Sequence, residues 1–269
     1  MDKPVKKELM MGNVAIARGL IENGCAVATS YPGTPASEIL ASVAKYQKQL
    51  GLRMHTQWAV NEKVAFEIAY AGSMAGCRSA VSMKQVGLNV ASDPLMSSAY
   101  MGTAGGFVVI SADDPGPHSS QTEQDSRMMA MMAKIPVLDP GSPSQAKDMV
   151  KMAFDLSEAF KTPVMLRPTT RICHSRQDIA PGPVSALTGR PDFNKDPSRW
   201  AATPKFRYQL HLELEAKLGQ IPAWETTAPL LLNQGASGPR AIVSSGVASA
   251  HTAEVLNRLG IWHTLPLYQ

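Results

Sequence analysis

The stretch "TQWAVNEKVAFEIAYAGSMAGCRSAVSMK" (residues 56–84) decides the fold. It begins with a short apolar run, continues as a helix-forming segment rich in alanine and glycine, and ends with a second short apolar run. A strand, a helix and a strand in this order make the unit of parallel sheets, because a parallel connection needs a crossover helix. Residues 56–84 therefore predict an α/β fold.

Segments of the same two kinds alternate on either side of this unit. Short buried strands are expected in "CAVATSYP" (25–32), "GFVVISADDP" (106–115) and "TPVMLRPTT" (162–170), with helices between them. The predicted fold is a doubly wound, mostly parallel sheet, whose ligand crevice lies beyond the carboxyl ends of its strands. The methionine-rich stretch "RMMAMMAKIP" (127–136) is interpreted as a pliable core helix.

The composition divides the chain into three parts. Residues 1–180 are expected to form the α/β domain, and residues 181–238 a linker rich in proline and glycine followed by a packing helix. Residues 239–269 restart a strand–turn–helix unit. Because one such unit cannot bury both faces of its sheet, we expect the third part to be the truncated start of a second α/β domain.

The overall composition limits the classes of function. The net charge of the 269 residues is +4 and the basic residues are scattered, so no nucleic-acid-binding surface is expected. No apolar run is long enough to cross a bilayer. The three cysteines, Cys25, Cys77 and Cys173, form no CxxC pair, so no metal or cluster ligand set is expected on this chain. Without a signal peptide, they predict reduced thiols in the cytoplasm.

The helix in the quoted stretch begins with an acid, Glu62. A helix N-terminus stabilises an anion by about 0.3–1 kcal/mol, whereas full burial destabilises it by roughly 4–7 kcal/mol. One interpretation is therefore a helix-start acid behind an Asn61 cap. The other is a poorly solvated acid that exchanges a proton with a ligand.

Three motifs carry a resemblance to a known family: "YPGTPASEI" (31–39), "NEKVAFEIAYAGSMAGCRS" (61–79) and "MKQVGLNVASDPLMSSAYMGTAGGFVVISADDPGPHSSQTEQDSR" (83–127). In order and combined length they resemble the thiamine-diphosphate-dependent 2-oxoacid:ferredoxin oxidoreductases, and among them the large (alpha) subunits of the indolepyruvate type. The resemblance resumes more weakly in "IVSSGVASAHTAEVL" (242–256). It implies a pyrimidine-binding domain followed by a transketolase-C-like domain.

The resemblance also assigns roles to residues of these motifs. It implies that Glu62 contacts N1′ of the aminopyrimidine and drives it to the imino tautomer, which removes the proton from C2 of the thiazolium ring. It implies that Thr34 faces the 2-oxoacid, with helix capping before Pro35 as the alternative. Cofactor contacts are expected at Gly87, Lys84 and Asn89. For Lys84 and Asn89, a surface salt bridge and a helix cap are the alternatives.

Substrate contacts are also expected in the polar loop "DDPGPHSSQTEQDSR" (113–127). Loops over a crevice often carry such contacts, and imidazole is the side chain that exchanges protons near neutral pH, so His118 and Arg127 are the candidates. Related pyruvate enzymes hold the carboxylate with an arginine in the preceding strand. Here that strand, "GFVVIS" (106–111), contains no arginine, which argues against pyruvate-like binding.

The missing motifs imply half an active site. No GDG motif for magnesium and diphosphate is present, and no cluster-binding cysteines are present. The resemblance therefore implies thiamine diphosphate shared with a diphosphate-binding domain or subunit, which would also carry Mg and 4Fe-4S clusters. A small gamma-like subunit, ferredoxin and coenzyme A are the other implied partners, in a dimer or hetero-oligomer.

The implied activity is ferredoxin-dependent oxidative decarboxylation of 2-oxoacids. Aryl pyruvates such as indolepyruvate would give acyl-CoA, CO2 and reduced ferredoxin. Two alternatives stay open. The chain could be a subunit of a non-oxidative thiamine-dependent 2-oxoacid decarboxylase, or a non-catalytic fragment that serves assembly alone.

Overall fold

The computed structural model describes residues 6–187, 191–201 and 203–269. A six-stranded parallel sheet lies at its centre, in the order β3-β2-β4-β5-β7-β6. Its strands are β2 (Val27–Ser30), β3 (His55–Trp58), β4 (Ser79–Lys84), β5 (Phe107–Ala112), β6 (Val137–Leu138) and β7 (Val164–Leu166). This sheet, with helices along it, confirms the predicted α/β fold.

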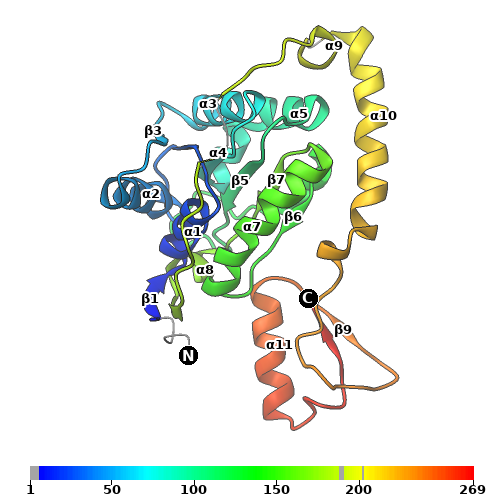
Figure 1. Ribbon diagram of the computed structural model, residues 1–269. Coiled ribbons are helices and arrows are strands. Elements are labelled where there is room, and N and C mark those ends of the chain that lie inside the picture. The colour runs from blue at the N-terminus through cyan, green and yellow to red at the C-terminus, as the bar shows by residue number, and fades with distance from the viewer. Residues whose placement is uncertain (1–5, 188–190, 202) are drawn as a thin grey trace.

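Helices cover both faces of the sheet (Figure 1). One face is covered by α1 (Gly12–Glu22), α2 (Ser37–Leu50) and α7 (Pro143–Phe160). The other is covered by α3 (Glu62–Met74), α4 (Gln85–Val90), α5 (Ser92–Met101) and α6 (Ser126–Ala133). The central strand β5 is buried along its whole length, and alternate residues such as Val108 and Val109 belong to opposite cores. Burial on both faces explains why this strand is a continuous apolar run.

A second, two-stranded sheet was not predicted. Strand β1 (Glu8–Met11) pairs antiparallel with β8 (Arg176–Ile179), so that Glu8 lies opposite Ile179. Helix α8 (Thr170–His174) connects β7 to β8. The pair brings the start of the chain beside the end of the α/β unit.

The rest of the chain runs along one side of the sheet domain and then below it in the view of Figure 1. Its elements are α9 (Pro197–Trp200), α10 (Pro204–Gln220), η1 (Ile221–Ala223), η2 (Glu225–Thr227), β9 (Ile242–Val243), α11 (Val247–Arg258) and β10 (Leu267–Tyr268). Helix α10 contacts α5 and buries Leu210 and Leu214. Strands β9 and β10 pair in parallel. Within the expected linker, residues 188–190 and 202 lie outside the described residues.

Two further observations concern the helices. None of the helices in the described ranges is both long and apolar enough to cross a membrane. The prediction of a methionine-rich core helix was wrong: in α6, Met128, Met131 and Met132 are 56%, 67% and 66% exposed. The helix buries its small residues Ala130 and Ala133 instead, because one face of an amphipathic helix suffices for the core.

Candidate active site

The loops that follow β2, β4 and β5 meet at the carboxyl edge of the sheet. Lys84 Nζ donates to the carbonyl oxygen of Ser119 (2.6 Å), and Ser119 Oγ donates to the carbonyl oxygen of Thr34 (3.4 Å). A Cβ atom on Gly33 would lie 3.1 Å from Cβ of Lys84. The three loops therefore lie together at the carboxyl ends of the strands, which is where doubly wound sheets bind ligands.

Glu62 is the first residue of α3, and two contacts fix the start of this helix. Asn61 Oδ1 accepts a hydrogen bond from the N–H of Val64 (2.8 Å), which is the expected N-cap. Thr29 Oγ1, in β2, donates to the carbonyl oxygen of Ala65 (2.6 Å). Caps of this kind contribute about 0.5–2 kcal/mol. The backbone of Glu62 is therefore held in place beside the sheet.

The Glu62 side chain lies against Gly87 in α4. A Cβ atom on Gly87 would be 2.4 Å from Glu62 Oε1 and 2.5 Å from its Cγ, so only glycine permits this approach. The side chain is half-buried. Within the described ranges, no hydrogen bond or ion pair ends on its carboxylate. The interpretation of Glu62 as a helix-start acid behind an Asn61 cap is confirmed. Its exchange of a proton with a ligand stays a prediction.

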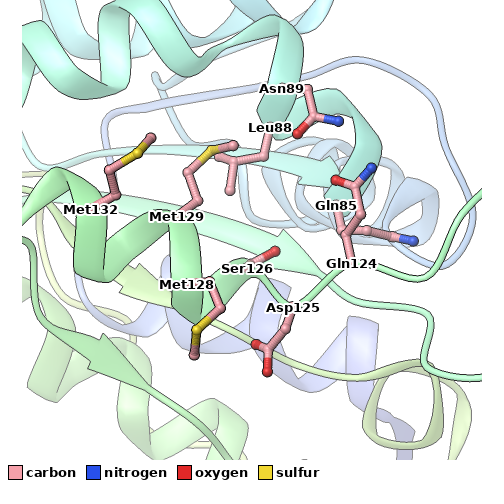
Figure 2. A pocket seen from close by; sticks show the side chains of 9 residues that line it. All are labelled: Gln85, Leu88, Asn89, Gln124, Asp125, Ser126, Met128, Met129 and Met132. Atoms are coloured by element: carbon pink, nitrogen blue, oxygen red, sulfur yellow. The ribbon is translucent and has the colours of Figure 1, made fainter.

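A pocket of about 280 Å³ opens between α4 and α6 (Figure 2). Leu88, Met128, Met129 and Met132 form its apolar wall, and its polar residues are Gln85, Asn89, Gln124, Asp125 and Ser126. Gln85 is fully buried. Its Nε2 donates to the carbonyl oxygen of Thr122 (3.3 Å), while its Oε1 has no hydrogen-bond partner among the described residues. The sequence analysis missed Gln85, although it directly follows a predicted strand end.

Two predicted cofactor contacts lie on different sides of this region. Asn89 is exposed and lines the pocket beside α4. Lys84 is half-buried, and its ammonium group joins the end of β4 to the loop after β5. A contact of either residue with the cofactor stays a prediction.

Thr34 lies at the same edge with its side chain exposed. The alternative role that we considered, capping of the following helix, was wrong. Helix α2 begins at Ser37 with Ala36 as its N-cap, and no side chain caps it. Instead Ser37 Oγ accepts a hydrogen bond from the N–H of Gly33 (2.8 Å) and closes the turn that presents Thr34.

The two loop candidates point in different directions. His118 is exposed and lines a separate pocket beside α8. Arg127 is engaged by acids: its Nη2 lies 2.6 Å from Asp125 Oδ2 and its Nη1 lies 3.4 Å from Asp139 Oδ2. The hydrogen bonds to Asp125 raise the pKa of Arg127. A substrate carboxylate would have to compete with both acids, and the role of Arg127 in binding stays a prediction.

A buried cluster of ion pairs joins the carboxyl ends of the strands β5, β7 and β6. Arg167, at the end of β7, is 7% exposed and its Nε lies 2.7 Å from Asp113 Oδ2. Asp113 also accepts hydrogen bonds from the N–H (3.0 Å) and hydroxyl of Ser126, at the start of α6. Arg167 Nη1 lies 3.5 Å from Asp139. The sequence analysis missed Arg167, but its donors face these acids and fix the strand ends.

Comparison with known proteins places this geometry in context. A family model described as pyruvate flavodoxin/ferredoxin oxidoreductase, thiamine diphosphate-binding, matches residues 18–213. The indolepyruvate oxidoreductase subunit IorA of Thermococcus kodakarensis is 43% identical over 266 residues, 97% of this chain and 41% of that protein. The IorA subunit of Archaeoglobus fulgidus is 40% identical over 263 residues, 97% and 42% of the two chains. The chain spans about two fifths of the length of these curated relatives.

A solved structure extends the comparison. The 2-oxoglutarate:ferredoxin oxidoreductase from Magnetococcus marinus, with 2-oxoglutarate, coenzyme A and succinyl-CoA bound, has a TM-score of 0.77 to this chain. The match covers 99% of this chain and 54% of that chain at 17% sequence identity. At this identity the likeness shows the fold alone.

Proposed function

This chain belongs to the thiamine-diphosphate-binding pyruvate flavodoxin/ferredoxin oxidoreductase family, and we propose that it forms the pyrimidine side of an active site that oxidatively decarboxylates 2-oxoacids. The observation that carries the proposal is the unpartnered carboxylate of Glu62 held against Gly87 at the carboxyl edge. Indolepyruvate and related aryl pyruvates are the proposed substrates, because the relatives aligned with nearly the whole chain are named indolepyruvate oxidoreductase subunits.

The residues at this edge fit a thiamine cofactor. Gly87 leaves room for an acid to approach the ring site, and the buried Gln85 Oε1 is an acceptor without a donor. When bound, thiamine diphosphate supplies the carbon nucleophile that attacks the 2-oxoacid and the electron sink for the loss of CO2. Glu62 would hold the proton that it shares with the aminopyrimidine N1′.

The site would be completed by other parts of the enzyme. We propose a diphosphate-binding domain or subunit that carries Mg and the 4Fe-4S clusters, with a small gamma-like subunit, ferredoxin and coenzyme A as further partners. Exposed apolar side chains near Glu62, such as Trp58 and Val60, support a partner at this edge. Thr34, at the same edge, is the proposed contact of the 2-oxoacid. Residues 239–269 are the proposed start of a transketolase-C-like domain.

The test of this function is Glu62→Gln in the complete enzyme. Hydrogen–deuterium exchange at C2 of thiamine, followed by NMR, should slow by about 100-fold or more, because general acid–base catalysis contributes factors of this size. Circular dichroism should show an unchanged fold. The matched control is Glu67→Gln, which changes an exposed glutamate of the same helix. In this variant C2 of thiamine should exchange at the wild-type rate. If C2 of thiamine also exchanged at the wild-type rate in Glu62→Gln, Glu62 would have no part in activation of the cofactor.

A further inference from the structure

A buried asparagine lies behind the turn that follows β2. Asn13, the second residue of α1, is fully buried. Its Nδ2 donates to the carbonyl oxygen of Pro35 (2.7 Å) and to Glu38 Oε2 (2.8 Å). Both partners belong to the turn after β2 and to the start of α2, and α1 and α2 cover the same face of the sheet (Figure 1). The amide therefore joins α1 to the segment that contains Thr34.

The two partners determine the orientation of the Asn13 amide. A carbonyl and a carboxylate both accept hydrogen bonds, so the amide must turn its nitrogen toward them. Its Oδ1 is buried and has no hydrogen-bond partner among the described residues. A buried acceptor without a donor lowers the stability of a fold. Packing alone therefore does not explain an asparagine at this position, whereas a fixed place for the carbonyl of Pro35 does.

The backbone around Thr34 is anchored by two other segments of the chain. The carbonyl oxygen of Thr34 accepts from Ser119 Oγ (3.4 Å), in the loop after β5, and the next carbonyl, that of Pro35, accepts from Asn13. The Thr34 side chain, in contrast, is exposed, and within the described ranges no hydrogen bond ends on its hydroxyl. A held backbone with a free hydroxyl is a preorganised ligand contact, because the surrounding residues fix its position before the ligand binds.

We propose that Asn13 is a positioning residue for binding of the 2-oxoacid, because it holds the turn that presents the Thr34 hydroxyl. This inference rests on the proposed function, in which Thr34 contacts the 2-oxoacid. Asn13 itself is buried behind the turn and acts only through Thr34. A displacement of about 1 Å in a group that orients a substrate can slow a reaction about 100-fold. A small movement of the Pro35 carbonyl is therefore enough to weaken binding.

The experiment is steady-state kinetics of Asn13→Asp in the complete enzyme, with indole-3-pyruvate as the substrate. Asparagine and aspartate have the same shape, but a carboxylate cannot donate, and here it would face the carbonyl of Pro35 and the carboxylate of Glu38. The turn should therefore move away from α1. We expect KM to rise about tenfold and kcat to change less than about threefold, because a contact made equally in the ground state and the transition state is lost. Asn13→Ser, which adds no charge and is one bond shorter, should show the same split.

A double-mutant cycle shows whether Asn13 acts through Thr34. Thr34→Val alone should raise KM about tenfold, since it removes the proposed contact. Adding Asn13→Asp to Thr34→Val should then raise KM less than about twofold, because the contact that Asn13 positions is already gone.

The matched control is a second buried asparagine far from this turn. Asn233 is 1% exposed, and its Nδ2 also donates to two carbonyl oxygens, those of Trp262 (2.6 Å) and Leu265 (2.9 Å). Asn233→Asp should lower the melting temperature, as Asn13→Asp does, because each loses buried hydrogen bonds. Only Asn13→Asp should change KM, which separates positioning of the turn from a general loss of stability.

Several results would overturn the role of Asn13. They are an unchanged KM in Asn13→Asp and Asn13→Ser, an equal rise of KM in Asn233→Asp, and effects of Asn13→Asp and Thr34→Val that simply multiply. An unchanged KM in Thr34→Val would overturn it too, because Asn13 is proposed to act through that residue. Exchange at C2 of thiamine needs no 2-oxoacid and should keep the wild-type rate in Asn13→Asp. Failure of this inference therefore leaves the test of Glu62, and with it the proposed function, unaffected.

Discussion

At the scale of single residues, Gly87 and Glu62 form one unit, because the carboxylate occupies the space where a side chain of residue 87 would lie. In Gly87→Ala the new Cβ would push the flexible end of Glu62 away, while alanine in α4 gains up to about 1 kcal/mol of helix propensity. We therefore expect the unfolding free energy to change by less than about 1 kcal/mol and C2 exchange to slow about tenfold or more.

The matched control for this substitution is Gly219→Ala in α10. A Cβ atom there would meet nothing within 4 Å, and the position is exposed. Chemical denaturation and C2 exchange, measured on both variants, separate the two effects. Equal exchange rates in the two alanine variants would show that the contact between Gly87 and Glu62 does not matter for activation.

Residues of the candidate active site could be predicted only where they belong to a recognisable sequence motif. Glu62 could be predicted as a candidate because it begins a helix directly after a strand. The resemblance of its motif to a known family then implied a contact with the aminopyrimidine of the cofactor. Gln85 could not be predicted, since its place in the site depends on a buried side-chain oxygen that has no hydrogen-bond partner among the described residues. Arg127 shows a different limit: the sequence made it a candidate for substrate binding but could not show that Asp125 and Asp139 form ion pairs with it.

At the scale of elements, Glu22 joins α1 to α7 and to the segment after β8. Its carboxylate lies 2.7 Å from Arg18 Nε and 2.8 Å from Lys147 Nζ, and accepts from the N–H of Gly182 at 2.5 Å. Burial acts to raise the pKa of Glu22, but the hydrogen bonds from Lys147 and Arg18 lower it below 4.5. A lowered folded pKa stabilises the fold above the unfolded value and loses that stability as the pH falls through the folded value.

Glu22→Gln should therefore destabilise the chain at neutral pH by about 1.5–3 kcal/mol, the usual contribution of charged hydrogen bonds. The difference from the wild type should shrink below about pH 4.5, measured as thermal melting temperature against pH. The control is Glu254→Gln, which removes an exposed ion pair with Arg258 in α11 and should cost little at any pH. A difference that stayed constant down to the acid limit would contradict this account.

The elements themselves were predictable where burial is continuous. Strand β5 is apolar on both faces and was the clearest prediction, because central parallel strands have no solvent side. The pair β1–β8 was missed, since "ELMM" and "RQDI" have mixed burial and neither strand alternates cleanly. The burial of the methionines of α6 was predicted wrongly. An apolar side chain in a sequence does not show whether it is buried in the core of its own domain or lies on a surface that a partner could cover.

At the scale of the whole molecule, those exposed methionines define a surface. We call Met128, Met131 and Met132 of α6 the methionine surface; they lie on the same side of the sheet as α4 and Glu62. Methionine is flexible and polarisable, and it is frequent at surfaces that accommodate a partner. If this chain supplies half of a shared site, as we propose, it needs such a surface beside that half. We expect the diphosphate-binding part of the enzyme to cover it.

Met131→Glu tests this expectation without touching the pocket, because Met131 does not line it. Burial of a methionine side chain contributes about 1.5–3 kcal/mol, and an unpaired buried carboxylate costs more, so association with the diphosphate-binding part should weaken at least about tenfold. Analytical ultracentrifugation of the mixed parts measures this change. Leu259→Glu is the matched control, since Leu259 is 65% exposed beyond α11, as Met131 is 67% exposed on α6. If both glutamate variants associated as tightly as the wild type, the partner would have to bind to a different face of the sheet domain.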